Sequence, residues 1–334
     1  MTDILIISTG GTIGSSFDGS HIETSPAPGG RLIQAYKKHC ENSVRFSTVS
    51  PYEILSENLD ARALSCLIQT IRINLEKYDG IIVTHGTDTL QYSACAVGYA
   101  FGAKTIPIVF VSANYILDDS RSNGFSNFFG AVDFISGTNG QGVFVCYQNT
   151  NGPVLIHRAT RLLPHDPYTD CLRSTRDSFF GTMVGGVFMP NPFYSALPDA
   201  VPPLLPDDFS SAVNRVLVVD SRPGGYLSLS RIDLRGIRSV LLLSYHSGTV
   251  NTSSKELAVF CRRLTEQGAN IFLCGADPHA PYASKTVFPR LGITELPPVS
   301  PVAAYMKAVM TTHKEKSDAA KIIASPLSED VFIL

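Results

Sequence analysis

The stretch Ile81–Tyr92, which reads IIVTHGTDTLQY, decides the fold class of this chain. Its first four residues are rich in β-branched side chains, which predicts a strand buried on both faces. A polar turn follows, and then a helix of small residues over Gln91–Phe101. Free backbone N–H groups and the positive end of the helix dipole converge at such a turn, so it can bind a ligand. One of its hydroxyls or its carboxylate can equally serve as a helix cap.

The N-terminus repeats this design. Residues Ile4–Ser8 predict another strand, and the glycine-rich turn Thr9–Gly14 follows it. Glycine allows positive φ angles and a close approach of the backbone. Strands alternate with helical patterns as far as residue 147, which predicts a parallel, right-handed, doubly wound sheet. Ligands of such sheets bind outside the carboxyl ends of the strands, where both turns are expected.

The ordered pair of turns resembles the bacterial L-asparaginase family. Its two signatures, TGGTI and HGTDT, stand unbroken at Thr9–Ile13 and His85–Thr89. The resemblance extends more loosely over the rest of the chain. It implies a larger N-terminal and a smaller C-terminal α/β domain, and an amidohydrolase that acts on L-asparagine or a related side-chain amide.

A proline-rich segment separates two α/β runs. Six prolines lie between Pro190 and Asp208, in a stretch with neither a helical nor a strand period. We therefore predict an N-terminal catalytic domain over residues 1–189, a linker over residues 190–212 and a smaller α/β domain over residues 213–334.

The overall composition predicts a cytoplasmic protein without disulfides. The chain has 334 residues, a formal net charge of −2, and seven scattered cysteines without C-x-x-C spacing. We expect no nucleic-acid partner because no basic block occurs, and no membrane segment because no apolar run approaches about 20 residues. A signal peptide is not expected at the N-terminus. Neither a metal nor another cofactor is expected, since no metal-ligand spacing occurs.

The resemblance implies roles for residues in both turns. Thr12 would attack the amide carbon and form an acyl-enzyme, while Thr87 and Asp88 would handle protons together with a lysine. Asp88 would also meet the α-ammonium group of the substrate. Backbone N–H groups of the turns, at Gly11 and Gly86, would polarise the amide oxygen.

Further substrate contacts are expected from two other segments. Ser56 falls where the family places a serine that holds the α-carboxylate, and Glu57 follows it; the alternative is an ordinary start of a helix. Ser112 and Ala113, after the predicted strand over residues 106–111, are also expected to bind substrate.

The sequence departs from the family at three places. Arg161 replaces the lysine of the RATK tetrad, and a guanidinium cannot act as a general base, although it could pair with Asp88. The predicted lid, residues 15–30, lacks the family's tyrosine and offers His21 and Thr24 as candidates. Arg121 is added after the next strand and could bind a substrate carboxylate or pair with a neighbouring aspartate.

The turn Tyr245–Thr249 corresponds to one that a neighbouring protomer contributes in related enzymes, which implies a homodimer or homotetramer. Other classes remain open. A nucleotide-binding oxidoreductase is disfavoured because the glycines are spaced G-G-x-x-G rather than G-x-G-x-x-G. Arg161 leaves open a non-catalytic amino-acid-binding homologue, and the altered lid together with Arg121 leaves open an amidase for a larger amide.

Overall fold

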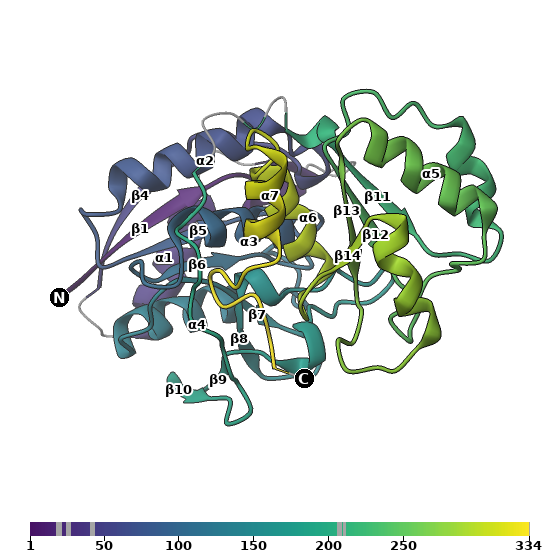
Figure 1. The fold of residues 1–334 in the computed structure, drawn as a ribbon. Coiled ribbons are helices and arrows are strands. Elements are labelled where there is room, and N and C mark those ends of the chain that lie inside the picture. The colour runs from purple at the N-terminus through teal and green to yellow at the C-terminus, as the bar shows by residue number, and fades with distance from the viewer. Residues whose placement is uncertain (18–21, 25–27, 41–43, 206–208, 210–211, 334) are drawn as a thin grey trace. The chain divides into compact units, whose positions relative to one another are not determined.

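The computed structural model describes residues 1–17, 22–24, 28–40, 44–205, 209 and 212–333. The chain divides into two compact units, Met1–Ser195 and Ala196–Leu334, each with its own sheet (Figure 1). The division falls inside the segment 190–212 that the sequence marks as a linker.

In the described residues of the first unit, eight strands form one sheet in the order β10-β9-β8-β7-β6-β5-β1-β4. The strands from β4 to β7 are parallel, and β8, β9 and β10 continue the sheet in antiparallel fashion. The sequence pattern predicted the parallel strands but not the three antiparallel ones. The strands are β1 (Thr2–Ser8), β4 (Val44–Val49), β5 (Gly80–Thr84), β6 (Ile108–Val111), β7 (Val143–Gln148), β8 (Val154–Arg158), β9 (Gly181–Val184) and β10 (Val187–Pro190).

The order of the parallel strands creates a topological switch point between β1 and β5. From β1 the chain crosses to β4 on one side, whereas from β5 it proceeds through β6 to β7 on the other side. Two connections that leave in opposite directions open a crevice at the carboxyl ends of the strands, where ligands of such sheets bind. Both signature turns lie at this crevice.

Helices cover both faces of the sheet. Helix α1 packs against α4, and α2 packs against α3. The core cluster on the α1 face contains Leu32 and Tyr36 of α1 together with Phe128 and Ala131 of α4. The described helices of this unit are α1 (Pro28–His39), α2 (Ala61–Asn74), α3 (Leu90–Phe101) and α4 (Gly124–Gly137), with short 3-10 helices η1 (Thr12–Gly14), η2 (Ser56–Asn58), η3 (Ala159–Arg161) and η4 (Thr175–Asp177).

The connections β5–α3–β6 and β6–α4–β7 step in the same direction along the sheet but lie on opposite faces, so they have opposite hands. The connections through α1, α2 and α3 share one hand, which is the right hand that parallel crossovers favour. The crossover through α4 is therefore left-handed. The prediction of a uniformly right-handed sheet is wrong at this connection, because a strand-and-helix pattern carries no information about the face to which a helix returns.

The predicted lid, residues 15–30, contains regular structure. Part of it is an antiparallel pair of strands, β2 (Ser15–Phe17) and β3 (Ile22–Thr24), and α1 already begins at Pro28. Three-residue strands are too short for their period to be recognised in a polar sequence.

Helix α2 has a side-chain cap. Asp60 precedes the helix and accepts a hydrogen bond from the Ala63 N–H at 2.8 Å, and the helix ends at Asn74.

The second unit contains a smaller parallel sheet in the order β11-β12-β13-β14. Its core cluster includes Val240, Leu242 and Leu273 of the sheet and Leu257 and Phe260 of α5. Its described elements are β11 (Val216–Asp220), β12 (Ser239–Leu243), β13 (Asn270–Cys274), β14 (Ile293–Glu295), α5 (Lys255–Glu266), α6 (Pro301–Met310), α7 (Lys316–Ile323), η5 (Val213–Arg215), η6 (Gly225–Arg231) and η7 (Ala283–Leu291).

Within the described ranges of both units, no helix has the length and apolar character that crossing a bilayer requires.

Candidate functional site

The two signature turns touch because β1 and β5 are neighbours in register. Ser8 and Thr84, the last residues of these strands, are paired. The turns meet at Gly11 and Gly86: a Cβ atom on Gly11 would lie 2.3 Å from Gly86 Cα, and Gly11 has a φ of +79°. Only glycine fits this contact. Thr9 reinforces it, since its buried hydroxyl donates to the Thr84 carbonyl at 2.8 Å.

The contact between the glycines positions the two candidate threonines. Thr12 directly follows Gly11 and begins η1, and Thr87 directly follows Gly86. Both side chains are half-buried, whereas Thr9 is 2% exposed and its hydroxyl is already bonded. Of the two threonines in the first turn, Thr12 is therefore the one that can present its hydroxyl to a ligand.

His85 stabilises the second turn and does not act as an acid at neutral pH. Its Nδ1 lies 2.8 Å from the Gly86 carbonyl, which can only accept, so Nδ1 carries the proton in this bond. Burial lowers the pKa of His85 below its ordinary value. The imidazole is therefore neutral at pH 7 and fixes the carbonyl of the contact glycine.

Ser56 and Asp88 come together although 32 positions separate them. The Ser56 hydroxyl donates to Asp88 Oδ2 at 2.8 Å, and the Asp88 N–H approaches Ser56 Oγ at 3.3 Å. The Thr89 hydroxyl donates to the Ser56 carbonyl at 2.9 Å. Ser56 is buried on η2, whereas Glu57, one position further, is exposed. The segment around Ser56 thus forms a third wall beside the two turns.

Ser112 and Ala113 lie at the same edge of the sheet, directly after β6, and both are fully buried. The Ser112 carbonyl accepts from Asn127 Nδ2 at 2.8 Å. The Ser112 hydroxyl is buried and finds no protein partner among the described residues. The substrate-binding role of these two residues stays a prediction.

Arg161 lies on η3, which packs against α3, and is fully buried. Its Nη2 donates to the Ser195 carbonyl at 2.6 Å, and its guanidinium carbon lies 4.3 Å from the centre of the Tyr194 ring. In the described structure, the hydrogen-bonded partner of the Asp88 carboxylate is Ser56 and not Arg161. The pairing of Arg161 with Asp88 that the sequence allowed is therefore not observed.

Of the two lid candidates, the structure describes only Thr24. His21 lies outside the described residues. Thr24 ends β3, where the backbone pairs with Ser15. Their roles stay predictions.

A cavity of about 730 Å³ opens beside the second turn. Thr87 and Asp88 form one side of it, together with Gln91 and Tyr92 from the start of α3. The opposite side is the loop of residues 164–170, which follows η3. A volume of this size is typical of small-molecule sites.

Most polar residues of this cavity were not predicted from the sequence, among them Asn114, His165 and Asp170. The Asp170 carboxylate accepts from Asn114 Nδ2 at 2.6 Å and also from the Tyr147 hydroxyl. The Tyr147 ring packs edge-on against His165, with centroids 5.9 Å apart. The loop that carries His165 and Asp170 has no recognisable motif, so only the tertiary structure could reveal it.

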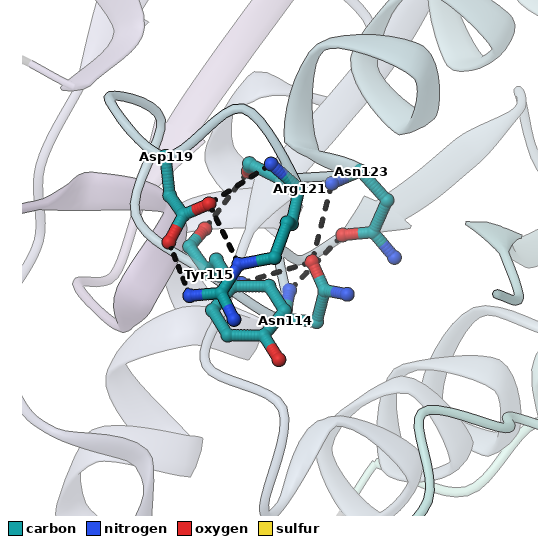
Figure 2. A network of polar contacts seen from close by, with 6 residues as sticks. Asn114, Tyr115, Asp119, Arg121 and Asn123 are labelled. Carbon is teal, nitrogen blue, oxygen red and sulfur yellow. Dashed lines mark hydrogen bonds and ion pairs between the residues drawn. The ribbon is translucent and has the colours of Figure 1, made fainter.

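Asn114 belongs to a polar network that shapes the loop after β6 (Figure 2). Its side-chain oxygen accepts from the N–H groups of Tyr115 and Asn123, at 2.9 and 3.2 Å. In the same network Arg121 pairs with Asp119, and its guanidinium lies 4.0 Å from the centre of the Tyr115 ring. Of the two alternatives for Arg121, the structure shows the pairing with a neighbouring aspartate. That hydrogen-bonded pair lowers the pKa of Asp119 to about 2.

No group of three or more potential metal ligands occurs among the residues that the structure describes. The arrangement that does occur is a pair of hydroxyls, a carboxylate and backbone N–H groups at a sheet edge. Such a set suits the attack of a hydroxyl on a carbonyl carbon.

Comparison with known proteins agrees with this class of site. Residues 3–187 match the family model described as asparaginase, N-terminal. The chain therefore belongs to the asparaginase family of amidohydrolases.

Curated relatives include subunits of glutamyl-tRNA(Gln) amidotransferases. The one from Thermoplasma volcanium is 30% identical over 159 residues, and the one from Methanosarcina acetivorans is 32% identical over 185 residues. These matches cover 47% and 54% of this chain, but only 39% and 43% of the relatives. The chain thus spans well under half the length of these relatives.

Solved structures with the same fold cover nearly the whole chain. The thermostable L-asparaginase from Thermococcus kodakarensis superimposes with a TM-score of 0.79 at 17% identity, covering 99% of this chain and 100% of its own. L-asparaginase I from Vibrio cholerae gives a TM-score of 0.78 at 18% identity, with 99% of both chains covered. These likenesses establish an asparaginase-like α/β fold, as the sequence predicted.

Proposed function

We propose that this protein hydrolyses the side-chain amide of L-asparagine, or of a related compound, to a carboxylate and ammonia. The observation that carries the proposal is the contact between Gly11 and Gly86 at the switch point of the sheet. Thr12 directly follows Gly11 in one signature turn, and Thr87 and Asp88 directly follow Gly86 in the other. A small-molecule amide is the substrate class, and neither a metal nor another cofactor takes part in the proposal.

In the proposed reaction Thr12 Oγ attacks the amide carbon, the C–N bond breaks, and ammonia leaves. Water then cleaves the ester to Thr12 and releases the acid. Backbone N–H groups of the two turns are the proposed donors for the oxyanion, but the N–H of Gly11 is not among them, because it already donates to the Ile54 carbonyl at 3.2 Å. Asp88 is held by Ser56 and supplies negative charge for an ammonium group of the substrate. Ser56, Glu57, Ser112 and Ala113 are the remaining proposed binding residues.

The names of the curated relatives support a second candidate function. A component of an amidotransferase that releases ammonia from an amide for transfer would need the same chemistry at Thr12. Over half of each relative has no counterpart in the matched region. We propose hydrolysis as the first candidate, with the protein cytoplasmic and assembled as a homodimer or homotetramer.

The experiment is an ammonia-release assay of the full chain with L-asparagine, L-glutamine and larger side-chain amides. Thr12→Ala should lower turnover by about 10³-fold or more, as loss of a covalent nucleophile does. Thr138→Ala, at the C-terminal end of α4 in the same unit, is the matched control and should keep full turnover. Retained turnover in Thr12→Ala would refute the threonine mechanism. Binding of aspartate without turnover of any amide would instead favour a non-catalytic homologue.

A further inference from the structure

The cavity beside Thr87 and Asp88 contains one residue whose ordinary pKa lies near neutrality. Its titratable lining residues are aspartates, tyrosines and His165. Aspartates titrate well below pH 7 and tyrosines well above it. Arg161, at the position of the family's lysine, keeps its proton at any pH a protein survives. His165 is thus the one lining residue of this cavity suited to exchange protons at neutral pH.

The position of the His165 ring decides which of its nitrogens can accept a proton. Nδ1 is buried and has no hydrogen-bond partner among the described residues. The neutral ring can therefore accept a proton from the cavity only at Nε2, in the tautomer that carries its own proton on Nδ1. The edge-on contact with Tyr147 holds the ring in place.

Three carboxylates and one tyrosine face His165. Asp88 comes from the turn after β5, Asp166 and Asp170 come from the same loop as His165, and Tyr147 comes from β7. Arg173 is paired with Asp166. Burial lowers the pKa of His165, and the three carboxylates oppose that shift without cancelling it.

We infer that His165 is a proton-handling residue of the proposed amidase reaction and sets its lower pH limit. When Thr12 Oγ bonds to the amide carbon, the proton of its hydroxyl passes by way of Thr87 and cavity water to the neutral imidazole. His165 returns that proton to the departing nitrogen, so that the C–N bond breaks and ammonia leaves with no net change in protons. The inference rests on the proposed function and adds to it the group that replaces the missing lysine.

The pH dependence follows from this role. The neutral imidazole is the active form, so turnover should fall as the pH drops through the pKa of His165. Since burial lowers that pKa from 6.5, the acid limb of kcat/KM should lie below pH 6.5. Asp166→Asn removes a carboxylate that raises the pKa of His165, so the limb should shift further toward low pH.

The test compares pH profiles of kcat/KM for ammonia release from the best amide. His165→Gln should lower kcat by about 10²-fold, the contribution of a positioned general base, with little change in KM. It should also remove the acid limb. His279→Gln, in the second unit, is the matched control and should leave the profile unchanged. Thermal melts check that the His165→Gln variant is folded.

Each outcome either supports or overturns the inference about His165. If His165→Gln keeps kcat within twofold and retains the limb, the inference is wrong, while loss of activity in Thr12→Ala still supports the proposed function. If Thr12→Ala is also active, the proposed function itself is wrong. If His165→Gln does not fold, Asp166→Asn decides: a limb that moves to lower pH supports the inference, and a fixed limb overturns it.

Discussion

Both sheets bring two turns into contact through a glycine, but only in the first sheet does this contact coincide with a reversal of the strand order. In the first sheet Gly11 meets Gly86, and in the second sheet a Cβ atom on Gly248 would lie 2.9 Å from Ala276 Cα. The strands of the second sheet follow one another in chain order, without a reversal. The first sheet reverses its winding direction between the strands that carry the touching turns. A close contact between turns is thus not enough; the reversal supplies the crevice.

Two pairs of ionisable side chains, one in each unit, have different surroundings. In the second unit Lys307 and Asp330 are fully buried and form an ion pair, and Lys307 Nζ also donates to the Ser325 carbonyl at 2.7 Å. In the first unit Asp88, which is exposed, and His165 line a cavity, and in the described structure the Asp88 carboxylate accepts from the Ser56 hydroxyl. Lys307 and Asp330 thus pair with each other, whereas Asp88 and His165 remain available to a ligand.

The largest expected effect tests this contrast in the second unit. Lys307→Met removes the cation that pairs with the buried Asp330 carboxylate, which should lower the free energy of unfolding by about 3 to 5 kcal/mol. Ammonia release at 25 °C should be unchanged. Denaturant titration of the full chain measures the first quantity. The double variant Lys307→Met, Asp330→Asn is the control: it removes both charges, keeps an acceptor for the Leu327 N–H and should recover part of the loss. No recovery at all would mean that the ion pair is not the cause.

A substitution at the contact between Gly11 and Gly86 should lower stability by less, but it should also lower activity. Gly11→Ala places a Cβ atom against the Gly86 backbone and forces a positive φ on alanine, which together cost about 2 to 4 kcal/mol. Because the contact positions Thr12 and Thr87, turnover should fall with it. Gly30→Ala is the matched control, since nothing lies within 4 Å of its Cβ position. If Gly11→Ala kept full activity, the contact between the two glycines would not be needed to position the reacting groups.

Local sequence patterns predicted the elements of the site but not its surroundings. The runs of β-branched residues at β1 and β5 correctly predicted two buried strands, and the glycines of the turns marked the place where they meet. The left-handed crossover through α4 and the antiparallel strands β8 to β10 were missed, because the strand-and-helix pattern does not specify on which face, or in which direction, a chain returns.

The cavity residues could not be predicted for a related reason. His165 and Asp170 lie in a proline-containing loop without periodicity, and they reach Thr87 and Asp88 only through tertiary packing. Arg161 was recognised as a departure from the family, but its contacts with Tyr194 and Ser195 depend on a segment more than 30 positions away.

The smallest expected effect is a pH dependence of the free energy of unfolding. It distinguishes His157, a structural histidine of the first unit, from His165. His157 on β8 is 1% exposed, its Nδ1 lies 2.8 Å from Ser174 Oγ, and its Nε2 finds no partner among the described residues. Burial lowers the pKa of His157 to about 3 from 6.5. Between pH 6.5 and a pH of about 3, His157 is therefore protonated in the unfolded chain but not in the folded chain. The stabilisation is fully present above pH 6.5 and is lost as the pH falls toward 3.

Between pH 7 and pH 5.5 this group alone should lower the free energy of unfolding by about 1 kcal/mol, with the unfolded histidine at its reference pKa of about 6.5. Denaturant titrations at the two pH values measure the loss. His157→Gln should reduce the pH dependence by that amount, whereas His279→Gln should leave it unchanged. The acid limb of catalysis should persist in His157→Gln, because His157 does not line the cavity. If His157→Gln removed that limb instead, the stability of the first unit and not the protonation of His165 would set the lower pH limit of the reaction.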